Sequence, residues 1–248
     1  MGLRTWLRRE ETNLERIPVH ETMRIGLCLT FIGGFLEVYT YLLHGGVFAN
    51  AQTGNLVLLA IFACRGDAHA LYYLAPIGAF FAGVLVSEGI RSTLTARQRE
   101  LWQHAVVLFE AVLLAAVAFL PDAAPDAVII VTISFICSLQ FNSFRKTHGL
   151  PYATTFCTGN LRSASENFYH WCFERDRERG VAAARYFAVI GVFVLGAFAG
   201  FFLTGLLGKR SILLCSALAL GVFSVMLAAP GAKNENMSNR KKSEENHR

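Results

Sequence analysis

Hydrophobic residues run through this chain in long stretches that are separated by short polar or charged segments. Six of the stretches hold 16 to 22 residues, close to the roughly 20 that a helix needs to cross a bilayer. A soluble helical protein would show a polar face along its helices, and these stretches mostly lack one. The pattern therefore predicts an all-α integral membrane protein with six transmembrane helices, at Met23–Leu43, Leu71–Ile90, Ala105–Leu120, Ala127–Phe144, Tyr186–Leu207 and Ile212–Ala229.

Two further segments share a Thr-Gly-Asn-Leu motif within apolar surroundings. The first, at about residues 47–64, contains "FANAQTGNLVLL" from Phe48, and the second, at about 153–172, overlaps "YATTFCTGNLRS" from Tyr152. Each segment is either a further span or a re-entrant hairpin that enters the membrane and leaves on the same side.

The distribution of positive charge bears on this choice, because cytoplasmic loops are rich in Lys and Arg. With six spans, two re-entrant segments and the N-terminus inside, 19 of the 23 Lys and Arg residues lie inside. Only Arg65, Lys209 and Arg210 then lie outside, and Arg162, within the second segment, is left uncounted. With eight spans the division is 15 inside and seven outside. The charges favour six spans plus two re-entrant segments, with both termini cytoplasmic.

The two halves of the chain match in more than the repeated motif. "GAFFAG" (Gly78–Gly83) follows the first motif and "GAFAG" (Gly196–Gly200) follows the second, and both suit close helix packing. The span before each motif carries a polar residue near its end, Glu37 or Asn142. Three spans per half place two similar halves upside down relative to each other, which predicts an inverted 3+3 repeat. The predicted regions are a cytoplasmic segment at 1–22, repeat 1 at 23–120, repeat 2 at 121–229 and a disordered cytoplasmic tail at 230–248.

The chemistry of Thr-Gly-Asn suits the start of a half-helix. Thr and Asn are N-cap residues, and the nine apolar residues after Asn55 would span about 13 Å as a helix, half of a bilayer. A helix start carries a partial positive charge and unpaired amides, so two facing starts would favour an anion or a hydrogen-bond acceptor. The alternative is a tight helix crossing, in which Gly54 and Gly159 permit contact and Asn55 and Asn160 cap locally.

Glu37 is the most unusual polar residue, because a carboxylate deep in an apolar span costs a few kcal/mol and is usually functional or paired. Pairing with Arg162, a role in proton coupling and a structural hydrogen bond all stay open. Arg162 either binds an anion or extends to the cytoplasmic face, and Glu88 and Glu110 are expected at the membrane interfaces. The candidate solute-binding residues are Glu37, Asn50, Gln52, Thr53, Gly54, Asn55, Gln140, Asn142, Thr158, Gly159, Asn160 and Arg162.

Composition agrees with a membrane protein and argues against other classes. Charged residues make up 17% of the chain, against about 25% in soluble domains, and the net charge of +5 reflects loop charges rather than nucleic-acid binding. The six cysteines show no metal or disulfide spacing, and the chain lacks HExxH, Gly-x-Ser-x-Gly, Walker and GxGxxG motifs. We therefore expect no catalysis, metal or cofactor. The expected partners are the lipid bilayer and a small polar solute. The sequence leaves open whether the protein forms a homo-oligomer.

Three strings in order resemble the YoaK-like family of bacterial multi-pass membrane proteins. They are "ETMRIGLCLTFIGGFLEVYTYLLHGGVFANAQTGNLVLLAI", "SLQFN" followed by "RK", and "TTFCTGNL", and the resemblance extends over roughly residues 20–230. Members of that family often have Asp at the position of Glu37. The family has no known function, so the resemblance implies a bacterial inner-membrane protein and supplies no substrate.

These observations predict a membrane transporter or channel for a small polar solute, with anions among the candidates, bound between the two Thr-Gly-Asn segments. The competing hypothesis is a non-transporting scaffold or a subunit of a larger membrane complex. A polar cavity at mid-depth would favour transport, and a dry centre around Asn55 and Asn160 would favour the scaffold. A membrane enzyme would need a catalytic pair, such as Glu37 with a histidine, and the spacing of these residues in the sequence does not indicate one.

Overall fold

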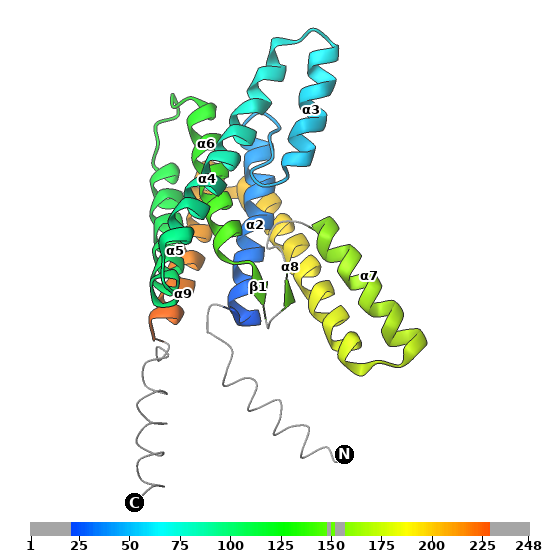
Figure 1. The fold of residues 1–248 in the computed structure, drawn as a ribbon. Coiled ribbons are helices and arrows are strands. Elements are labelled where there is room, and N and C mark those ends of the chain that lie inside the picture. The colour runs from blue at the N-terminus through cyan, green and yellow to red at the C-terminus, as the bar shows by residue number, and fades with distance from the viewer. Residues whose placement is uncertain (1–20, 148–149, 152–156, 229–248) are drawn as a thin grey trace, which may run out of the picture.

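The computed structural model describes residues 21–147, 150–151 and 157–228 as a helical fold with one short strand pair (Figure 1). The predicted cytoplasmic N-terminal segment and disordered tail fall almost wholly outside these residues and stay predictions. Strands β1 (Lys146–Thr147) and β2 (Leu150–Pro151) pair antiparallel. The helices are α2 (Met23–Leu43), α3 (Gln52–Cys64), η2 (Ala68–Tyr73), α4 (Leu74–Thr93), α5 (Ala96–Ala118), α6 (Asp126–Ser143), α7 (Cys157–Glu174), α8 (Arg177–Leu207), η3 (Gly208–Ile212) and α9 (Leu213–Ala228).

By length and composition, five helical stretches among the described residues suffice to cross a membrane. The last of them, Arg177–Ala228, contains two helices, because the short 3-10 helix η3 separates α8 from α9. Helix α3 is apolar but has only 13 residues. The five stretches are Met23–Leu43, Ala68–Thr93, Leu101–Ala118, Asp126–Ser143 and Arg177–Ala228.

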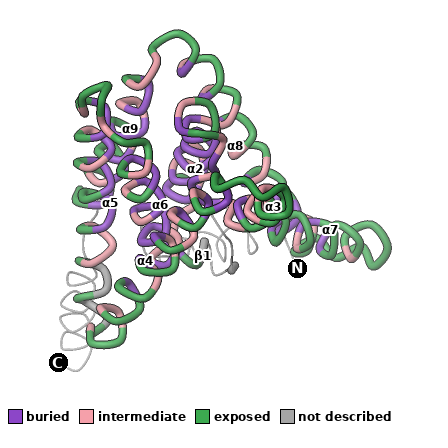
Figure 2. The backbone as a smooth tube through the Cα atoms, turned by 90° about the horizontal axis from the view of Figure 1, so that it is seen from above, coloured by how far each residue is buried: buried purple, intermediate pink, exposed green. Residues whose placement is uncertain are grey.

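Large apolar side chains cover the outside of the bundle, where Figure 2 shows much of the backbone as exposed. Phe119 is 70% exposed, Phe202 is 67% exposed and Leu206 is 77% exposed. Soluble monomers rarely leave so much apolar surface in contact with water, whereas lipid hydrocarbon can cover it. The surface therefore agrees with the apolar helices in indicating a membrane protein.

Two helices begin earlier than the hydrophobic pattern predicts. Helix α5 begins at Ala96 rather than Ala105, with Thr95 and Gln98 forming a capping box. Helix α8 begins at Arg177 rather than Tyr186, and the Asp176 side chain accepts hydrogen bonds from the first-turn amides. Hydrophobicity marks where a helix meets an apolar medium, while caps mark where the helix begins, so the hydrophobic pattern omits the charged first turns.

Helix α2 forms the centre of the bundle and pairs with α8, while α4 pairs with α6 and α5 pairs with α9. Figure 2 shows the buried backbone concentrated in α2, α5 and α6. The side chains of Leu29, Ile32, Phe35 and Leu36 on α2 are fully buried in the main core. Helices α3 and α7 lie at the periphery, and on each of them few residues are buried.

Glycines bring the paired helices into close contact. A Cβ atom on Gly196 would overlap the carbonyl oxygen of Phe31 in α2, and one on Gly83 would lie 2.8 Å from the carbonyl oxygen of Phe135 in α6. Small residues allow such close backbone approach. The close packing predicted for the two glycine motifs is thus confirmed at Gly83 and Gly196. A Cβ atom on Gly78, in contrast, would have nothing within 4 Å among the described residues.

The two ends of the bundle carry different polar contacts and are named here by one residue each. At the His44 end, where α2 finishes, His44 Nδ1 lies 2.7 Å from Asp126 Oδ1 at the start of α6. At the Arg145 end, where α6 finishes, Arg145 Nη2 lies 2.6 Å from Glu88 Oε2 of α4. Helix α2 runs from the Arg145 end to the His44 end (Figure 1).

Candidate functional site

Glu37 of α2 is buried and binds the loop that precedes α3. The residue is only 6% exposed, and its Oε1 accepts a hydrogen bond of 3.2 Å from the backbone N–H of Asn50. Glu37 precedes His44 by seven residues, which is about 10 Å along a helix. The chain therefore turns back after α2 by about two helical turns before α3 begins. Gly45 (φ 74°) and Gly46 (φ 71°) form this turn in a conformation that suits glycine.

Asn55 of the first motif holds this loop in place. Its Oδ1 accepts from the Phe48 N–H at 3.0 Å, and its Nδ2 donates to the Phe48 carbonyl at 2.8 Å and to Gln52 Oε1 at 2.9 Å. Gly54 lies beneath the Phe48 ring, whose Cδ2 would be 2.8 Å from an added Cβ. Thr53 points to the exposed side of α3. The first motif thus uses Asn55 and Gly54 to hold its own loop. The expected N-caps and helix crossing are not found, because the N-cap of α3 is Ala51 and a Cβ atom on Gly159 would have nothing within 4 Å among the described residues.

The second motif lies in the first turn of α7. Cys157 lies within electrostatic range of the Glu37 carboxylate, and Asn160 is buried. Thr158 and Gly159 are exposed. Residues 152–156, the first part of the second string, lie outside the described residues. Figure 1 shows α3 leading upward and α7 leading downward from the neighbourhood of α2, and the interactions of Asn50 and Cys157 with Glu37 bring the starts of both helices towards that residue.

Several buried polar atoms on α2, α5, α6 and the loop before α3 have no hydrogen-bond partner among the described residues. They are Glu37 through Oε2, Asn50 and Gln140 through both amide atoms, and Glu110 through both carboxylate oxygens. Cys137 of α6 lies within electrostatic range of Glu37 and Glu110 and beside Asn50, and Gln140 follows it by one turn. Buried polar atoms are nearly always hydrogen-bonded, so these atoms mark a place for water, protons or a solute. We call Glu37, Asn50, Glu110, Cys137 and Gln140 the polar centre.

The expectation that Glu110 lies at a membrane interface is wrong. The residue is 0% exposed and lies well inside α5. The error follows from the predicted start of the span at Ala105, which puts Glu110 near an end. The sequence does contain the missing signal, because Thr95 and Gln98 have the spacing of a capping box and place the helix start nine residues earlier.

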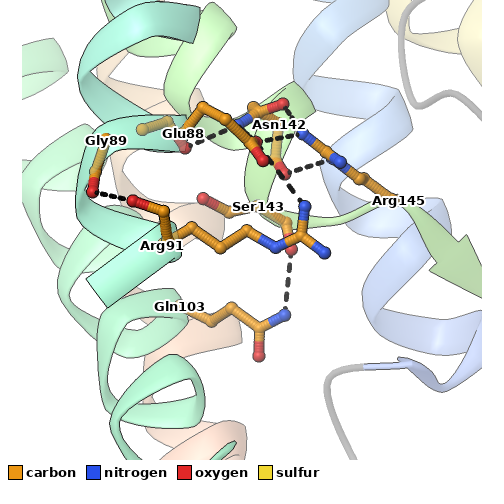
Figure 3. Close-up of polar contacts among 9 residues, drawn as sticks. Glu88, Gly89, Arg91, Gln103, Asn142, Ser143 and Arg145 are labelled. Carbon is orange, nitrogen blue, oxygen red and sulfur yellow. Dashed lines mark hydrogen bonds and ion pairs between the residues drawn. The ribbon is translucent and has the colours of Figure 1, made fainter. Parts of the chain in front are cut away.

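Asn142 belongs to a different cluster, at the Arg145 end. Its Nδ2 donates to Ser87 Oγ at 3.0 Å and to Glu88 Oε2 at 3.1 Å, and its Oδ1 accepts from Arg145. Figure 3 shows Asn142 and Arg145 converging on Glu88, with Gln103 bonded to the Ser143 carbonyl nearby. Glu88 is half exposed and pairs with Arg91 and Arg145 near the end of α4, in keeping with the interfacial position expected for it. This cluster ties α4, α5 and α6 together and lies apart from the polar centre.

Arg162 does not approach Glu37. Its side chain is 81% exposed, and its Nε donates to Glu166 Oε1 at 2.8 Å, one turn further along α7. The hydrogen bond to Glu166 raises the already high pKa of the guanidinium. The hypothesis of a Glu37–Arg162 pair is therefore wrong, and α7 presents Arg162 on its polar outer face.

A cavity of about 280 Å³ lies at the His44 end, and no motif in the sequence points to it. Its lining includes Tyr39, His44 and Asp126, together with the ion pair between Lys209 and Asp122. The hydrogen bond from Lys209 lowers the pKa of the exposed Asp122 carboxyl. Among the described residues, no group of three or more His, Cys, Asp and Glu is arranged to hold a metal ion.

Comparison with known proteins gives one match. The model of a family described as a protein of unknown function (DUF1275) matches residues 25–226, from the first turn of α2 to the last turns of α9. No curated protein and no solved structure matches the chain. The matched range contains both Thr-Gly-Asn motifs and every residue of the polar centre.

Proposed function

The chain belongs to DUF1275, a family of proteins of unknown function, and we propose that it is a membrane transporter or channel for a small polar solute. The observation that carries the proposal is the polar centre, where buried side chains hold polar atoms that have no partner among the described residues, near the starts of two helices. Interrupted helices that begin inside the membrane are a recurring way to build solute sites in transporters. The proposed function is non-enzymatic, with the bilayer and the solute as partners.

The proposed membrane arrangement has six spans and two re-entrant segments, α3 and α7. Helix α3, at 13 residues, reaches about 20 Å, too short for the hydrocarbon core of about 30 Å. Helix α7 is outside the apolar stretches and carries ion pairs on its exposed face. The Lys and Arg distribution supports cytoplasmic termini, and the YoaK-like resemblance supports a bacterial inner membrane.

An inverted repeat is supported by the way the helices pair. If α2, α3, α4 and α5 correspond to α6, α7, α8 and α9, the packing of α2 on α8 corresponds to that of α6 on α4. The contact of α5 with α6 likewise corresponds to that of α9 with α2. The glycine contacts repeat as well, since Gly196 meets the Phe31 carbonyl and Gly83 meets the Phe135 carbonyl. The two phenylalanines stand in related strings, "TFI" and "SFI".

The composition of the polar centre favours an uncharged polar solute over an anion. The backbone N–H of Asn50, just before the first motif, already donates to the Glu37 carboxyl and is therefore not free to bind an anion. Arg162, the cation that an anion would need, lies on the outer face of α7. The side-chain amides of Asn50 and Gln140 offer both donors and acceptors, which suits hydroxyl or amide groups.

The scaffold is the second candidate, and one specific observation favours it. The Asn55 side chain is engaged through both its oxygen and its nitrogen by Phe48 and Gln52, so the first motif binds its own loop rather than a solute. A scaffold would leave the polar centre to internal water. The two candidates therefore differ in whether a solute can pass through the polar centre.

Osmotic swelling of proteoliposomes distinguishes the two candidates. Vesicles containing the full-length protein are exposed to glycerol, urea, alanine or acetate, and light scattering reports the rate of re-swelling. A transporter or channel accelerates at least one rate above that of protein-free vesicles, and Gln140→Leu removes the acceleration, whereas the exposed Thr53→Ala does not. Rates equal to those of empty vesicles for every solute would reject this proposal for these solute classes and favour the scaffold.

A further inference from the structure

We propose that Glu37 is a proton-exchanging group and that Glu110, which shares Cys137 as a neighbour with it, is an acid that holds its proton more tightly. Coupling of this proton to solute movement rests on the proposed transport function, but the protonation itself does not. The basis is the placement of two carboxyl groups in the interior of the bundle without a cation. Neither group takes part in an ion pair among the described residues.

The groups that face these two carboxyls are thiols and amides. Glu110 of α5 has Cys137 of α6 and Cys215 of α9 within electrostatic range. Glu37 of α2 has Cys137 and, at the start of α7, Cys157. No Lys or Arg whose burial is described is buried. The one buried histidine of the described residues, His44, is engaged with Asp126 at the end of the bundle.

A carboxylate without a counter-ion is strongly disfavoured in an apolar interior, so it binds a proton or a metal cation. The described residues contain no cluster of ligands arranged for a metal ion. Both carboxyls are therefore assigned as neutral acids in the resting protein. A neutral acid also fits beside the thiols of Cys137 and Cys215, which offer no positive charge.

The two acids differ in what would stabilise their anions. Glu37 Oε1 accepts from the Asn50 N–H, and the amides of Ala49 and Ala51 also face this carboxyl. Backbone N–H groups at a helix start stabilise a negative charge. The two oxygens of Glu110 have no hydrogen-bond partner among the described residues. Glu37 can thus release its proton more readily than Glu110.

The proposed exchange gives the polar centre one mobile proton. In the second half of the chain, α6 carries the amides of Gln140 and Asn142 where α2 carries a carboxyl. The second half therefore adds no carboxyl group to the polar centre. Release of the proton leaves the Glu37 anion on the amides of the loop before α3. Uptake of the proton removes the charge from that contact and weakens it without breaking it, which links the charge of Glu37 to how firmly the loop before α3 is held.

Infrared spectroscopy of the purified full-length protein tests the assignment without knowledge of the solute. Spectra are recorded from acidic to alkaline pH for the wild type, Glu37→Gln, Glu110→Gln and the exposed-site control Glu88→Gln. We expect one carboxylic C=O band that persists to higher pH than the other and is lost in Glu110→Gln. We expect a second band that disappears on alkalisation and is lost in Glu37→Gln. Glu88→Gln should leave both bands in place.

Several results would overturn the assignment. One is a carboxylic C=O region that is unchanged in Glu37→Gln and Glu110→Gln. Another is a change of either band on addition of Na⁺ at constant pH, which would make a metal cation the counter-ion. If Glu37→Gln fails to fold, Glu37→Asp should shift the second band rather than remove it, and an unshifted band counts against the proposal. Failure of the swelling assay would reject transport and leave the infrared bands unaffected.

Discussion

The backbone N–H of Asn50 donates to the carboxyl of Glu37 over 3.2 Å, although 13 residues separate the two. The contact holds the start of α3 two helical turns below the end of α2. It also brings the first Thr-Gly-Asn motif close to the point that Cys157 reaches from α7. Glu37 is therefore the residue through which α2 positions the first motif, and the start of the second motif lies within electrostatic range of it.

Replacement of Glu37 tests this positioning role. Glu37→Ala leaves the Asn50 N–H buried without its acceptor, and we expect a loss of about 1–3 kcal/mol in the free energy of unfolding. Glu37→Gln keeps an acceptor oxygen, so its stability should lie close to that of the wild type. Thermal unfolding in detergent measures both variants. Equal stability of Glu37→Ala and the wild type would show that the loop is held without Glu37.

Asn55 should prove more important for stability than its neighbours in the motif. Asn55→Leu removes three hydrogen bonds to Phe48 and Gln52 and leaves the Phe48 backbone groups unpaired, and we expect a loss of about 2–4 kcal/mol. Thr53→Ala, on the exposed side of the same helix, should be nearly neutral. Thermal unfolding and the yield of monodisperse protein report the difference. Similar behaviour of the two variants would argue against the Asn55 clamp.

The glycines of α8 provide a matched pair for the crossing with α2. Gly196→Ala places a methyl group on the Phe31 carbonyl, and we expect a destabilisation of about 1–3 kcal/mol. Gly191→Ala lies on the same helix with nothing within 4 Å among the described residues, so it should be neutral or stabilise by up to about 1 kcal/mol. Chemical or thermal unfolding compares the two. A neutral Gly196→Ala would mean that the helices can separate at little cost.

The Asp122–Lys209 pair at the His44 end gives a pH-dependent prediction. Lys209 lowers the folded-state pKa of Asp122, so the pair stabilises above the ordinary Asp value of about 3.9 and loses this contribution as pH falls through the lowered value. Asp122 is exposed, so the effect should be small and weakened by salt. Asp122→Asn should lower the unfolding temperature slightly at neutral pH and not at all in strong acid. An equal difference at both pH values would contradict the assignment.

The apolar helices could be predicted because long hydrophobic stretches directly reflect contact with an apolar medium. The predicted Met23–Leu43 coincides with α2, and Ala127–Phe144 differs from α6 by one residue at each end. The hydrophobic pattern places the start of α5 too late, because its first two turns are polar and only the cap at Thr95 marks them. The same error explains the expectation that Glu110 lies at a membrane interface. A span that began at Ala105 would put Glu110 near its end, whereas a helix that begins at Ala96 puts it well inside.

The candidate site could be predicted only in part. Glu37, Asn50 and Gln140 are buried in the polar centre, and a carboxyl or amide inside an apolar stretch is a local signal. The partners of these residues depend on how the loop after α2 folds back, which hydrophobic periodicity does not encode. The same signal assigns Asn142 to the site, yet its place further along α6 brings it to Glu88 instead.

Two native cysteines make the membrane arrangement directly testable. Cys64 ends α3 and Cys172 lies in the last turn of α7, and both are exposed. With six spans and two re-entrant segments, Cys64 faces the outside and Cys172 the cytoplasm. With eight spans, both face the cytoplasm. Cys64 alone therefore distinguishes the two arrangements, and Cys172 serves as the internal control.

The measurement uses two variants that each keep one of these cysteines, with the other five replaced by Ser or Ala. A membrane-impermeant maleimide should label the Cys64 variant in intact cells and the Cys172 variant only after permeabilisation. Protection of Cys64 in intact cells, with labelling after permeabilisation, would reject the re-entrant α3 in favour of eight spans. Because α3 starts beside Glu37, an external Cys64 also means that the polar centre is reached from the outside by a helix that never crosses the membrane.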